Sequence, residues 1–185
     1  MSTEFGQDHG LVHEAVITGR KVGADRDFWA ALAHSEVLFA KVVAFVAEML
    51  RLVFTLKAAT DRDMTGWECK EPVKGEGEFE LELKEFLRKG ESYLGGEDMV
   101  KRAKELGVDS GLRHLEAVLR EQDKIPVEMR QFCLVSTEVW VGPNGDRDVW
   151  YLDWRGGRWV LFSYWLDNDF NSSCRLVSPR KYQKS

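Results

Sequence analysis

QFCLVSTEVWVGPNGDRDVWYLDWRGGRWVLFSYW, residues 131–165, contains three runs of β-branched and aromatic residues, at 131–141, 147–154 and 158–165. Residues of these types are enriched in β-strands. The runs are separated by Pro143-Asn144-Gly145 and by Arg155-Gly156-Gly157, which are turn signals between paired strands. The stretch therefore predicts three antiparallel strands joined by two tight turns.

The segments on either side of these strands complete an α+β domain over residues 78–185. EFELELK at 78–84 alternates strictly between polar and apolar residues, as a half-buried strand does. Two helices are expected next, at 97–107 and 110–122, and Gly107 is placed to end the first. A polar loop at 167–173 then leads to a short closing strand at 174–177. A strand, two helices and several antiparallel strands are typical of an α+β fold.

The first part of the chain has a different pattern. Residues 1–24 show no periodicity and are expected to be loose, and Asp25 or Asp27 is expected to cap the helix that follows. Ser35 separates this helix from a longer apolar one that should reach about Lys57. We therefore expect an N-terminal helical segment at 1–60 and a linker at 61–77, which contains Gly66, Pro72, Gly75 and Gly77.

The apolar stretch at 37–56 has 20 residues, about the length that spans a bilayer. Lys41, Glu48 and Arg51 interrupt it at helical spacing and form one polar stripe. Each such charge costs roughly 2.5–3.5 kcal/mol near the centre of a membrane, so we expect no membrane span. The wide apolar surface of this helix predicts packing against its own protein or, in a homo-oligomer, against another copy.

Composition narrows the possible partners. The formal net charge is −5 and the sequence pI is near 5.5, whereas binding to nucleic acid favours a basic surface. Nucleic acid is therefore not expected as a partner. Three cysteines without CxxC spacing fit a reducing compartment, and the first ten residues carry neither the basic nor the apolar region of a secretory signal. We expect a cytoplasmic protein.

No catalytic residue, metal ligand or cofactor motif is expected. His9 and His13 have the spacing of two ligands on one helix, but nothing near them completes a metal site. Cys133 and Cys174 fall in strands without a histidine close in sequence, so we expect structural thiols, although folding could bring His114 near them. The sequence thus predicts a protein that is not an enzyme.

Two alternatives stay open. One is an enzyme of unrecognised type that uses Asp167, Asp169 or Cys174. The other is a small DNA-binding regulator that uses the helix pair 97–122. The second helix of that pair carries Arg113, His114, Arg120 and Gln122, and His114 is expected at the surface or edge of this helix.

The aromatic residues are the most informative feature. Five of the seven tryptophans lie between Trp140 and Trp165, and Trp150, Trp154 and Trp159 are expected to build the core of the sheet. The run from Phe162 to Ser173 instead mixes aromatic and small polar residues. Rigid rings and short polar side chains are the composition of a binding surface. A solvated loop has a similar composition and is the alternative.

The C-terminal sequence resembles the end of the formylglycine-generating-enzyme type of C-type lectin fold. That family tends to read RGGSW, then a segment rich in Asn and Asp, then a closing GFR strand; here the residues are WRGGRW at 154–159, DNDFN at 167–171 and CRLV at 174–177. Arg158 replaces the serine, and the catalytic cysteine pair of the enzyme branch has no match. The resemblance therefore implies the non-enzymatic branch, which includes the variable proteins of diversity-generating retroelements.

These variable proteins display diversified residues for ligand binding. The retroelements rewrite adenines, often in AAC or AAT codons, and the resulting codons can specify Phe, Ser, Tyr, Leu, Asp, Asn and Cys but not Trp. Residues 161–174 consist of these types except for Trp165. The resemblance implies a protein or glycan ligand, with Tyr164 and Phe170 as anchors and Trp159 and Trp165 as scaffold. The implied ligand-binding residues are Phe162, Ser163, Tyr164, Asp167, Asn168, Asp169, Phe170, Asn171 and Ser172.

Overall fold

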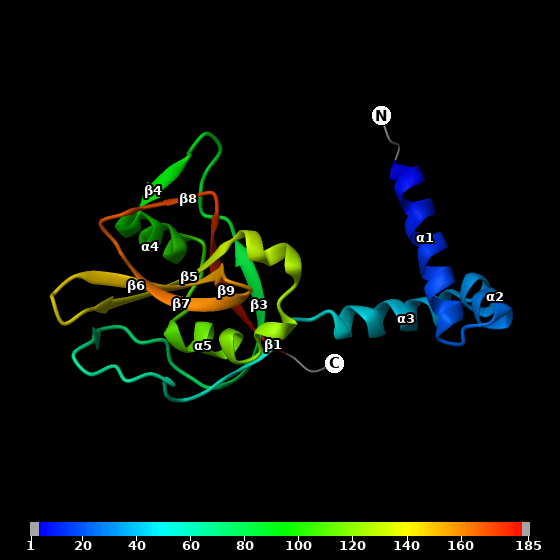
Figure 1. The fold of residues 1–185 in the computed structure, drawn as a ribbon, viewed down its shortest axis with the longest axis horizontal. Coiled ribbons are helices and arrows are strands. Elements are labelled where there is room, and N and C mark those ends of the chain that lie inside the picture. The colour runs from blue at the N-terminus through cyan, green and yellow to red at the C-terminus, as the bar shows by residue number, and fades with distance from the viewer. Residues whose placement is uncertain (1–3, 183–185) are drawn as a thin grey trace. The chain divides into compact units, whose positions relative to one another are not determined.

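The computed structural model describes residues 4–182, and the chain divides between Arg51 and Leu52 into two compact units. We call residues 4–51 unit 1 and residues 52–182 unit 2. Figure 1 shows helices α1 to α3 in unit 1 and all the strands in unit 2.

Unit 1 consists of α1 (Glu4–Lys21), α2 (Arg26–His34) and α3 (Glu36–Met49). The expected cap of α2 is confirmed, because Asp25 Oδ1 accepts a hydrogen bond of 2.8 Å from the amide of Phe28. The break at Ser35 is also confirmed. The prediction that residues 1–24 are loose is wrong for 4–21, because glycines only weaken a helix and this segment has no proline to break it.

Unit 2 is built on a sheet with the strand order β1-β3-β9-β5-β6-β7, and β2 pairs with β5 outside this path. The strands of this sheet are β1 (Val53–Leu56), β2 (Glu68–Cys69), β3 (Gly77–Lys84), β5 (Cys133–Val141), β6 (Arg147–Arg155), β7 (Arg158–Trp165) and β9 (Cys174–Lys181). Two shorter strands, β4 (Tyr93–Gly95) and β8 (Asp169–Asn171), form a separate pair. Unit 2 is therefore the α+β arrangement that the sequence predicts.

The strand that opens the predicted domain, β3, lies antiparallel to the last strand, β9. In turn β9 runs parallel to β5, which continues into the antiparallel β5-β6-β7 meander. Gly156 and Gly157 have φ values of 59° and 82°, so they adopt the left-handed conformation that a two-residue hairpin turn requires. This turn fixes the register of β6 and β7, with Tyr151 opposite Phe162.

Two helices between β4 and β5 cover the two faces of the sheet, as Figure 1 shows: α5 (Leu112–Arg120) lies on one face and α4 (Gly96–Glu105) on the other. Because side chains alternate along a strand, each face has its own core. Leu115 and Val118 of α5 pack with Leu152, Trp159 and Leu161. Met99 and Ala103 of α4 pack with Val135, Val149 and Phe170. Short 3₁₀ helices at Gln122–Lys124 and Val127–Gln131 lead into β5.

The predicted boundary between the two parts is wrong in position. The long helix ends at Met49 rather than near Lys57, because residues 53–56 pair with β3 as strand β1. Phe54 is only 1% exposed there, so burial in the sheet outweighs the helical spacing of the preceding residues. Unit 2 thus begins about 26 residues earlier than predicted, at Leu52 rather than at residue 78.

Residues 57–76, which we call the strap, include most of the predicted linker at 61–77 and belong to unit 2. The guanidinium group of Arg113 donates hydrogen bonds of 2.7–2.9 Å to the backbone carbonyls of Lys57, Ala58 and Gly75. It also donates to the carbonyl of Val73. Two buried carboxylates hold the strap at other points: Glu116 accepts from Thr60 Oγ1 at 2.6 Å, and Glu138 accepts from the amide of Val73 at 2.7 Å. These contacts fix the strap on the body of unit 2 although its composition is that of a loop.

Within residues 4–182, no single helix is long and apolar enough to cross a membrane. The α2 and α3 helices meet that criterion of length and composition when they are taken together, and they are bent by 102° at their junction.

Candidate ligand-binding face

The alternation of β7 divides the expected site residues between the two faces of the sheet. Phe162 and Tyr164 lie on the same face as Tyr151, whose ring contacts both of theirs. Ser163 and Trp165 point to the other face, where their register partners are Trp150 and Asp148. The predicted set therefore does not form one surface.

Three aromatic rings form an open patch, which we call the aromatic face: Tyr151 of β6 and Phe162 and Tyr164 of β7. The Tyr151 and Phe162 ring centroids are 5.6 Å apart, and those of Tyr151 and Tyr164 are 5.9 Å apart at an interplanar angle of 72°. Tyr164 is 37% exposed, whereas Tyr151 and Phe162 are half-buried. This patch lies on the face that α4 covers, because Tyr151 packs against the same core as Met99 and Val149.

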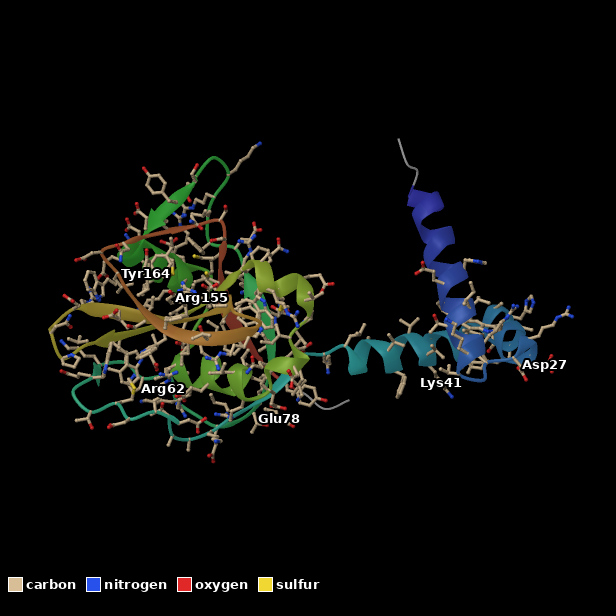
Figure 2. The ribbon with its side chains drawn as sticks, in the orientation of Figure 1. Asp27, Lys41, Arg62, Glu78, Arg155 and Tyr164 are labelled. Carbon is tan, nitrogen blue, oxygen red and sulfur yellow. The ribbon has the colours of Figure 1, made fainter. Side chains whose placement is uncertain are left out.

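Charged side chains border the aromatic face. The guanidinium carbon of Arg155 lies 4.6 Å from the centroid of the Phe162 ring, within the range of a cation–π contact. Arg155 Nε also donates to Asp153 Oδ2 at 2.7 Å, and this pairing raises the pKa of Arg155. Burial raises the pKa of Tyr151, so its hydroxyl stays protonated at neutral pH. Figure 2 labels Arg155 and Tyr164 on this part of unit 2.

Two thiols adjoin this border. Cys133 of β5 and Cys174 of β9 are direct register partners on neighbouring parallel strands, and both are half-buried free thiols. The Cys133 Sγ atom lies 3.6 Å from Asp153 Oδ1. These thiols, Asp153 and Arg155 form a continuous polar edge beside the three rings.

The segment 167–172 is only partly available to a ligand. Asp167, Asp169, Asn171 and Ser172 are exposed, and Asn168 is half-buried. The oxygen Oδ1 of Asn171 accepts hydrogen bonds from the amide and hydroxyl of Ser173, so this side chain also shapes the turn into β9. This part of the expected site lies at the end of the pair β4 and β8, where the exposed Tyr93 is opposite Asn171.

Two expected roles are wrong. Phe170 is only 2% exposed, because the strand β8 turns its ring into the core beneath α4, and it cannot be an exposed anchor. Trp165 is 54% exposed rather than part of the scaffold, because it lies at the end of β7, and the core on its face involves Trp159 and Leu161 instead. The expected burial of Trp150 and Trp159 is confirmed, and Trp154 packs partly buried against them.

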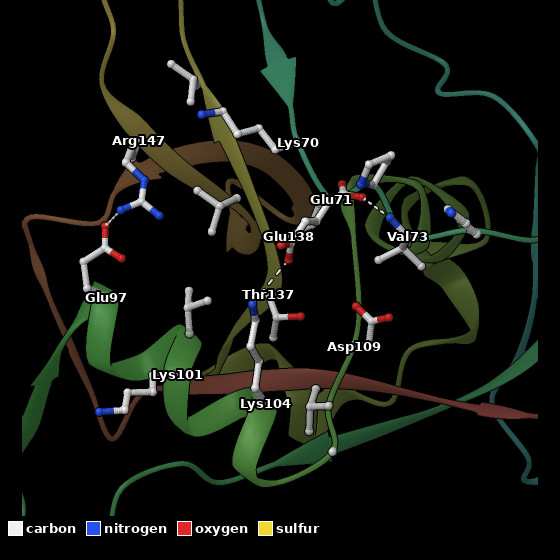
Figure 3. Close-up of a pocket in the computed structure, with 17 residues that line it drawn as sticks. Lys70, Glu71, Val73, Glu97, Lys101, Lys104, Asp109, Thr137, Glu138 and Arg147 are labelled. Atoms are coloured by element: carbon white, nitrogen blue, oxygen red, sulfur yellow. Dashed lines mark hydrogen bonds and ion pairs between the residues drawn. The ribbon is translucent and has the colours of Figure 1, made fainter.

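A groove with a volume of about 1230 Å³ lies between the strap, α4 and the β5–β6 hairpin (Figure 3). Val100, Val108, Val139 and Val141 contribute its apolar lining. Two ion pairs lie along it: Lys104 Nζ lies 3.3 Å from Glu71 Oε2, and Arg147 pairs with Glu97. None of the ligand-binding residues expected from the sequence lines this groove, so the aromatic face remains the better candidate.

The helix pair does not present a DNA-reading surface. His114 is buried against Phe79, at a ring distance of 4.9 Å, so the prediction that it lies at the surface is wrong. Arg113 is committed to the strap, and Arg120 donates to Asp61 and to the carbonyl of Thr55. Gln122 Oε1 accepts from the amide of Trp159 at 3.0 Å. The side chains that would read base edges are therefore already engaged within unit 2.

The described residues contain neither a metal-binding cluster nor a histidine beside Cys133 or Cys174, which the enzyme alternative could use. No group of three or more His, Cys, Asp or Glu side chains within them is arranged to hold a metal ion. His114 packs in the α5 core, whereas Cys133 and Cys174 adjoin the α4 core on the opposite face. The side chain of His9 lies outside the described residues, and His13 is exposed on α1.

Comparison of the chain with protein-family models, with curated proteins and with solved structures finds no match.

Three residues of the candidate face were missed in the sequence: Tyr151, Asp153 and Arg155. A signal for them exists, because the two-glycine turn at 156–157 places residues 151 and 162 opposite each other when the strands are paired outward from it. Extending that register by steps of two gives the face shared by residues 151, 153 and 155. The surface is formed by the two strands together, so neither strand shows it alone.

Proposed function

We propose that unit 2 is a ligand-binding module and that its binding surface is the aromatic face with its polar edge. The observation that carries the proposal is a set of three partly exposed rings on the paired strands β6 and β7, in which Tyr151 contacts both Phe162 and Tyr164. Aromatic side chains supply most of the energy at binding surfaces because they bury a large area with few rotatable bonds. Aromatic rings without a role at the surface are usually buried in the core of a protein.

Contacts with neighbouring side chains hold the rings of this surface in place before a ligand binds. Tyr164 rests edge-on against the buried Phe170, and Tyr151 contacts both Phe162 and Tyr164. The strands β6 and β7 are paired along their length from residue 148 to residue 165. Rings held in this way lose little conformational freedom when a ligand binds, which lowers the cost of association.

We further propose that unit 2 has a C-type-lectin-like fold of the type used by variable proteins of diversity-generating retroelements. Three features support this: the pairing of β3 with the final strand β9, the two helices between β4 and β5, and the β5-β6-β7 meander. In this interpretation Phe162, Tyr164 and the exposed residues 167, 169, 171 and 172 are the variable positions, and the buried residues between them are constant. The cellular compartment proposed is the cytoplasm.

The proposed ligand is a protein, with a glycan as the alternative class. Tyr164, Arg155 and the exposed side chains of β8 lie on an open surface rather than in an enclosed pocket, and tyrosine and arginine are enriched in protein–protein interfaces. Aromatic rings beside carboxylates also stack on sugars, so the test includes both ligand classes.

The experiment presents the full chain to a random-peptide display library and to a glycan array, and measures the affinity of every ligand obtained. The variant Tyr164→Ala is compared with Trp165→Ala, which removes an exposed ring from the next position on the opposite face. We expect Tyr164→Ala to weaken binding by about 30-fold or more, as loss of a hot-spot residue worth about 2 kcal/mol does. Trp165→Ala should have little effect. Ligands whose binding is weakened by Trp165→Ala and not by Tyr164→Ala would show that the binding surface is not the aromatic face.

A further inference from the structure

The geometry of Cys133 and Cys174 is suited to covalent chemistry. Their Cα atoms are register partners at the first residues of the parallel strands β5 and β9. Adjacent strands are about 4.8 Å apart, and a disulfide needs a Cα separation of about 4.4–6.8 Å. Because register partners on adjacent strands project to the same face of the sheet, the two thiols lie side by side. A bond between them therefore needs side-chain rotation but no movement of the strands.

The surroundings of the two thiols differ in charge. Cys133 faces the carboxylate of Asp153, which disfavours a thiolate, and Tyr151 is a further titratable neighbour. Cys174 is close to the guanidinium group of Arg175, the hydroxyl of Ser173 and the backbone amide of Asn171.

These neighbours separate the two thiols electrostatically. The neighbouring Cys133 side chain, together with those groups, lowers the pKa of Cys174 to about 7, whereas the pKa of Cys133 is raised. The pair therefore consists of a nucleophile at Cys174 and a proton donor at Cys133. An attacking thiol reacts fastest when its pKa is near the ambient pH.

We propose that Cys133 and Cys174 form a dithiol site that exchanges with small disulfides and closes to an intramolecular disulfide. In the first step the Cys174 thiolate attacks one sulfur of a disulfide RS–SR, the S–S bond breaks, and the products are Cys174–S–SR and RS⁻. In the second step the Cys133 thiol gives its proton to the RS⁻ released in the first step, and its sulfur attacks the sulfur of Cys174, which breaks the Cys174–S–SR bond. The second RS⁻ leaves and takes a proton from water, so one disulfide is reduced to two thiols while the two cysteines are oxidised.

The position of the site relates it to the aromatic face without depending on it. Closing the disulfide removes the thiol donor from Asp153 Oδ1, while Asp153 Oδ2 keeps its contact with Arg155 Nε. The polar edge thus changes its hydrogen bonding with the oxidation state of the pair. Thiol exchange is measured on the cysteines themselves, so its failure would leave the ligand-binding proposal standing.

The test incubates the reduced full chain with oxidised glutathione at pH 7, blocks the remaining thiols with iodoacetamide and locates each modification by mass spectrometry. We expect a product lighter by two hydrogens in which Cys133 and Cys174 are linked and Cys69 is alkylated. The variant Cys133→Ser should accumulate glutathione on Cys174, because the second step is blocked. Cys174→Ser should not react, and the matched control Cys69→Ser should behave as the unmodified chain does.

A second measurement needs no variant. Burial raises the pKa of Cys69 to about 11, so at pH 7 iodoacetamide should alkylate Cys174 on the order of 100-fold faster than Cys69, after allowing for the weaker intrinsic nucleophilicity of the more acidic thiol. Half-maximal labelling of Cys174 should occur near pH 7. Equal labelling of Cys69 and Cys174, or a Cys133→Ser protein with native circular dichroism that traps no glutathione, would overturn the proposal.

Discussion

Tyr164 and Phe170 contact each other edge to face, with ring centroids 5.3 Å apart and an interplanar angle of 89°, yet only Tyr164 reaches solvent. Tyr164 is 37% exposed and Phe170 is 2% exposed. The contact joins β7 to β8, so the buried ring holds the exposed one in place. Two aromatic residues of similar size in one segment therefore have different roles.

Replacing each ring by alanine should separate these roles. Phe170→Ala should lower the free energy of unfolding by about 3–5 kcal/mol, because it leaves a cavity under α4. Tyr164→Ala should lower it by only about 1 kcal/mol, because its ring loses mainly surface contacts. Denaturant unfolding followed by tryptophan fluorescence gives both values. Equal losses for the two variants would mean that the surface and the core are assigned wrongly.

Arg113→Lys should loosen the strap and leave the sheet intact. A lysine cannot reproduce the planar fork with which Arg113 reaches four carbonyls, and hydrogen bonds from a charged donor are worth about 1.5–3 kcal/mol. Amide hydrogen exchange in residues 57–75 should therefore be about 10- to 100-fold faster, while β6 is unchanged. Arg158→Lys, at the exposed first residue of β7, is the matched control. Unaltered exchange in the strap would show that Arg113 does not hold it.

Acid should destabilise unit 2 through His114. Burial lowers the pKa of His114 from 6.5 to about 4 in the folded protein, so the unfolded chain binds more protons between these two values. Stability is therefore complete above about pH 6.5 and is lost as the pH falls toward 4, by about 3 kcal/mol for this group.

The variant His114→Asn isolates this effect, because an amide oxygen can still accept from the Gly111 amide, as the Nδ1 atom of His114 does at 3.1 Å. Unfolding free energies measured at pH 7 and pH 4.5 should differ by about 2–3 kcal/mol less in the variant than in the unmodified protein. The same pH dependence in both proteins would exclude His114 as its source.

Removal of unit 1 should abolish self-association. Within the described side chains of unit 1, Leu32 is the one large apolar residue that is buried, whereas Val37, Phe39, Val43, Phe45, Val46 and Leu50 are 45–73% exposed. An apolar surface of this kind is expected to be covered, and we predict another copy of the chain. Sedimentation velocity should give an oligomer for the full chain and a monomer for residues 52–185. A monomeric full chain would refute this prediction.

The sequence predicts much of the fold because local chemistry and tertiary structure agree there. The alternation at 78–84 and the turns at 143–145 and 156–157 specify strands that the structure contains. Gly107, two residues after the end of α4, has the left-handed backbone conformation expected there, with a φ of 66°. The strap could not be predicted in this way, because its order comes from Arg113, Glu116 and Glu138, which are 38 or more residues from some of the groups they bind.

The candidate site was predictable in part. Tyr164 and Phe162 lie on the aromatic face, as their composition and strand position suggest. The burial of Phe170 was not visible, because β8 is three residues long and its inward side depends on its pairing with β4. The meeting of Cys133 with Cys174 depends on parallel pairing between strands about 41 residues apart, which no local pattern encodes.

The proposal that unit 2 carries a diversified ligand-binding surface is tested by sequencing the gene and the DNA downstream of it. We expect a near-copy of the segment for residues 161–174 beside a reverse transcriptase gene, with differences only at adenines of the copy. Those differences should fall in codons for exposed residues such as Tyr164 and Asp167 and spare Leu166 and Phe170, which are each 2% exposed. The absence of such a copy, or differences concentrated in the buried codons, would show that this surface of unit 2 is not diversified.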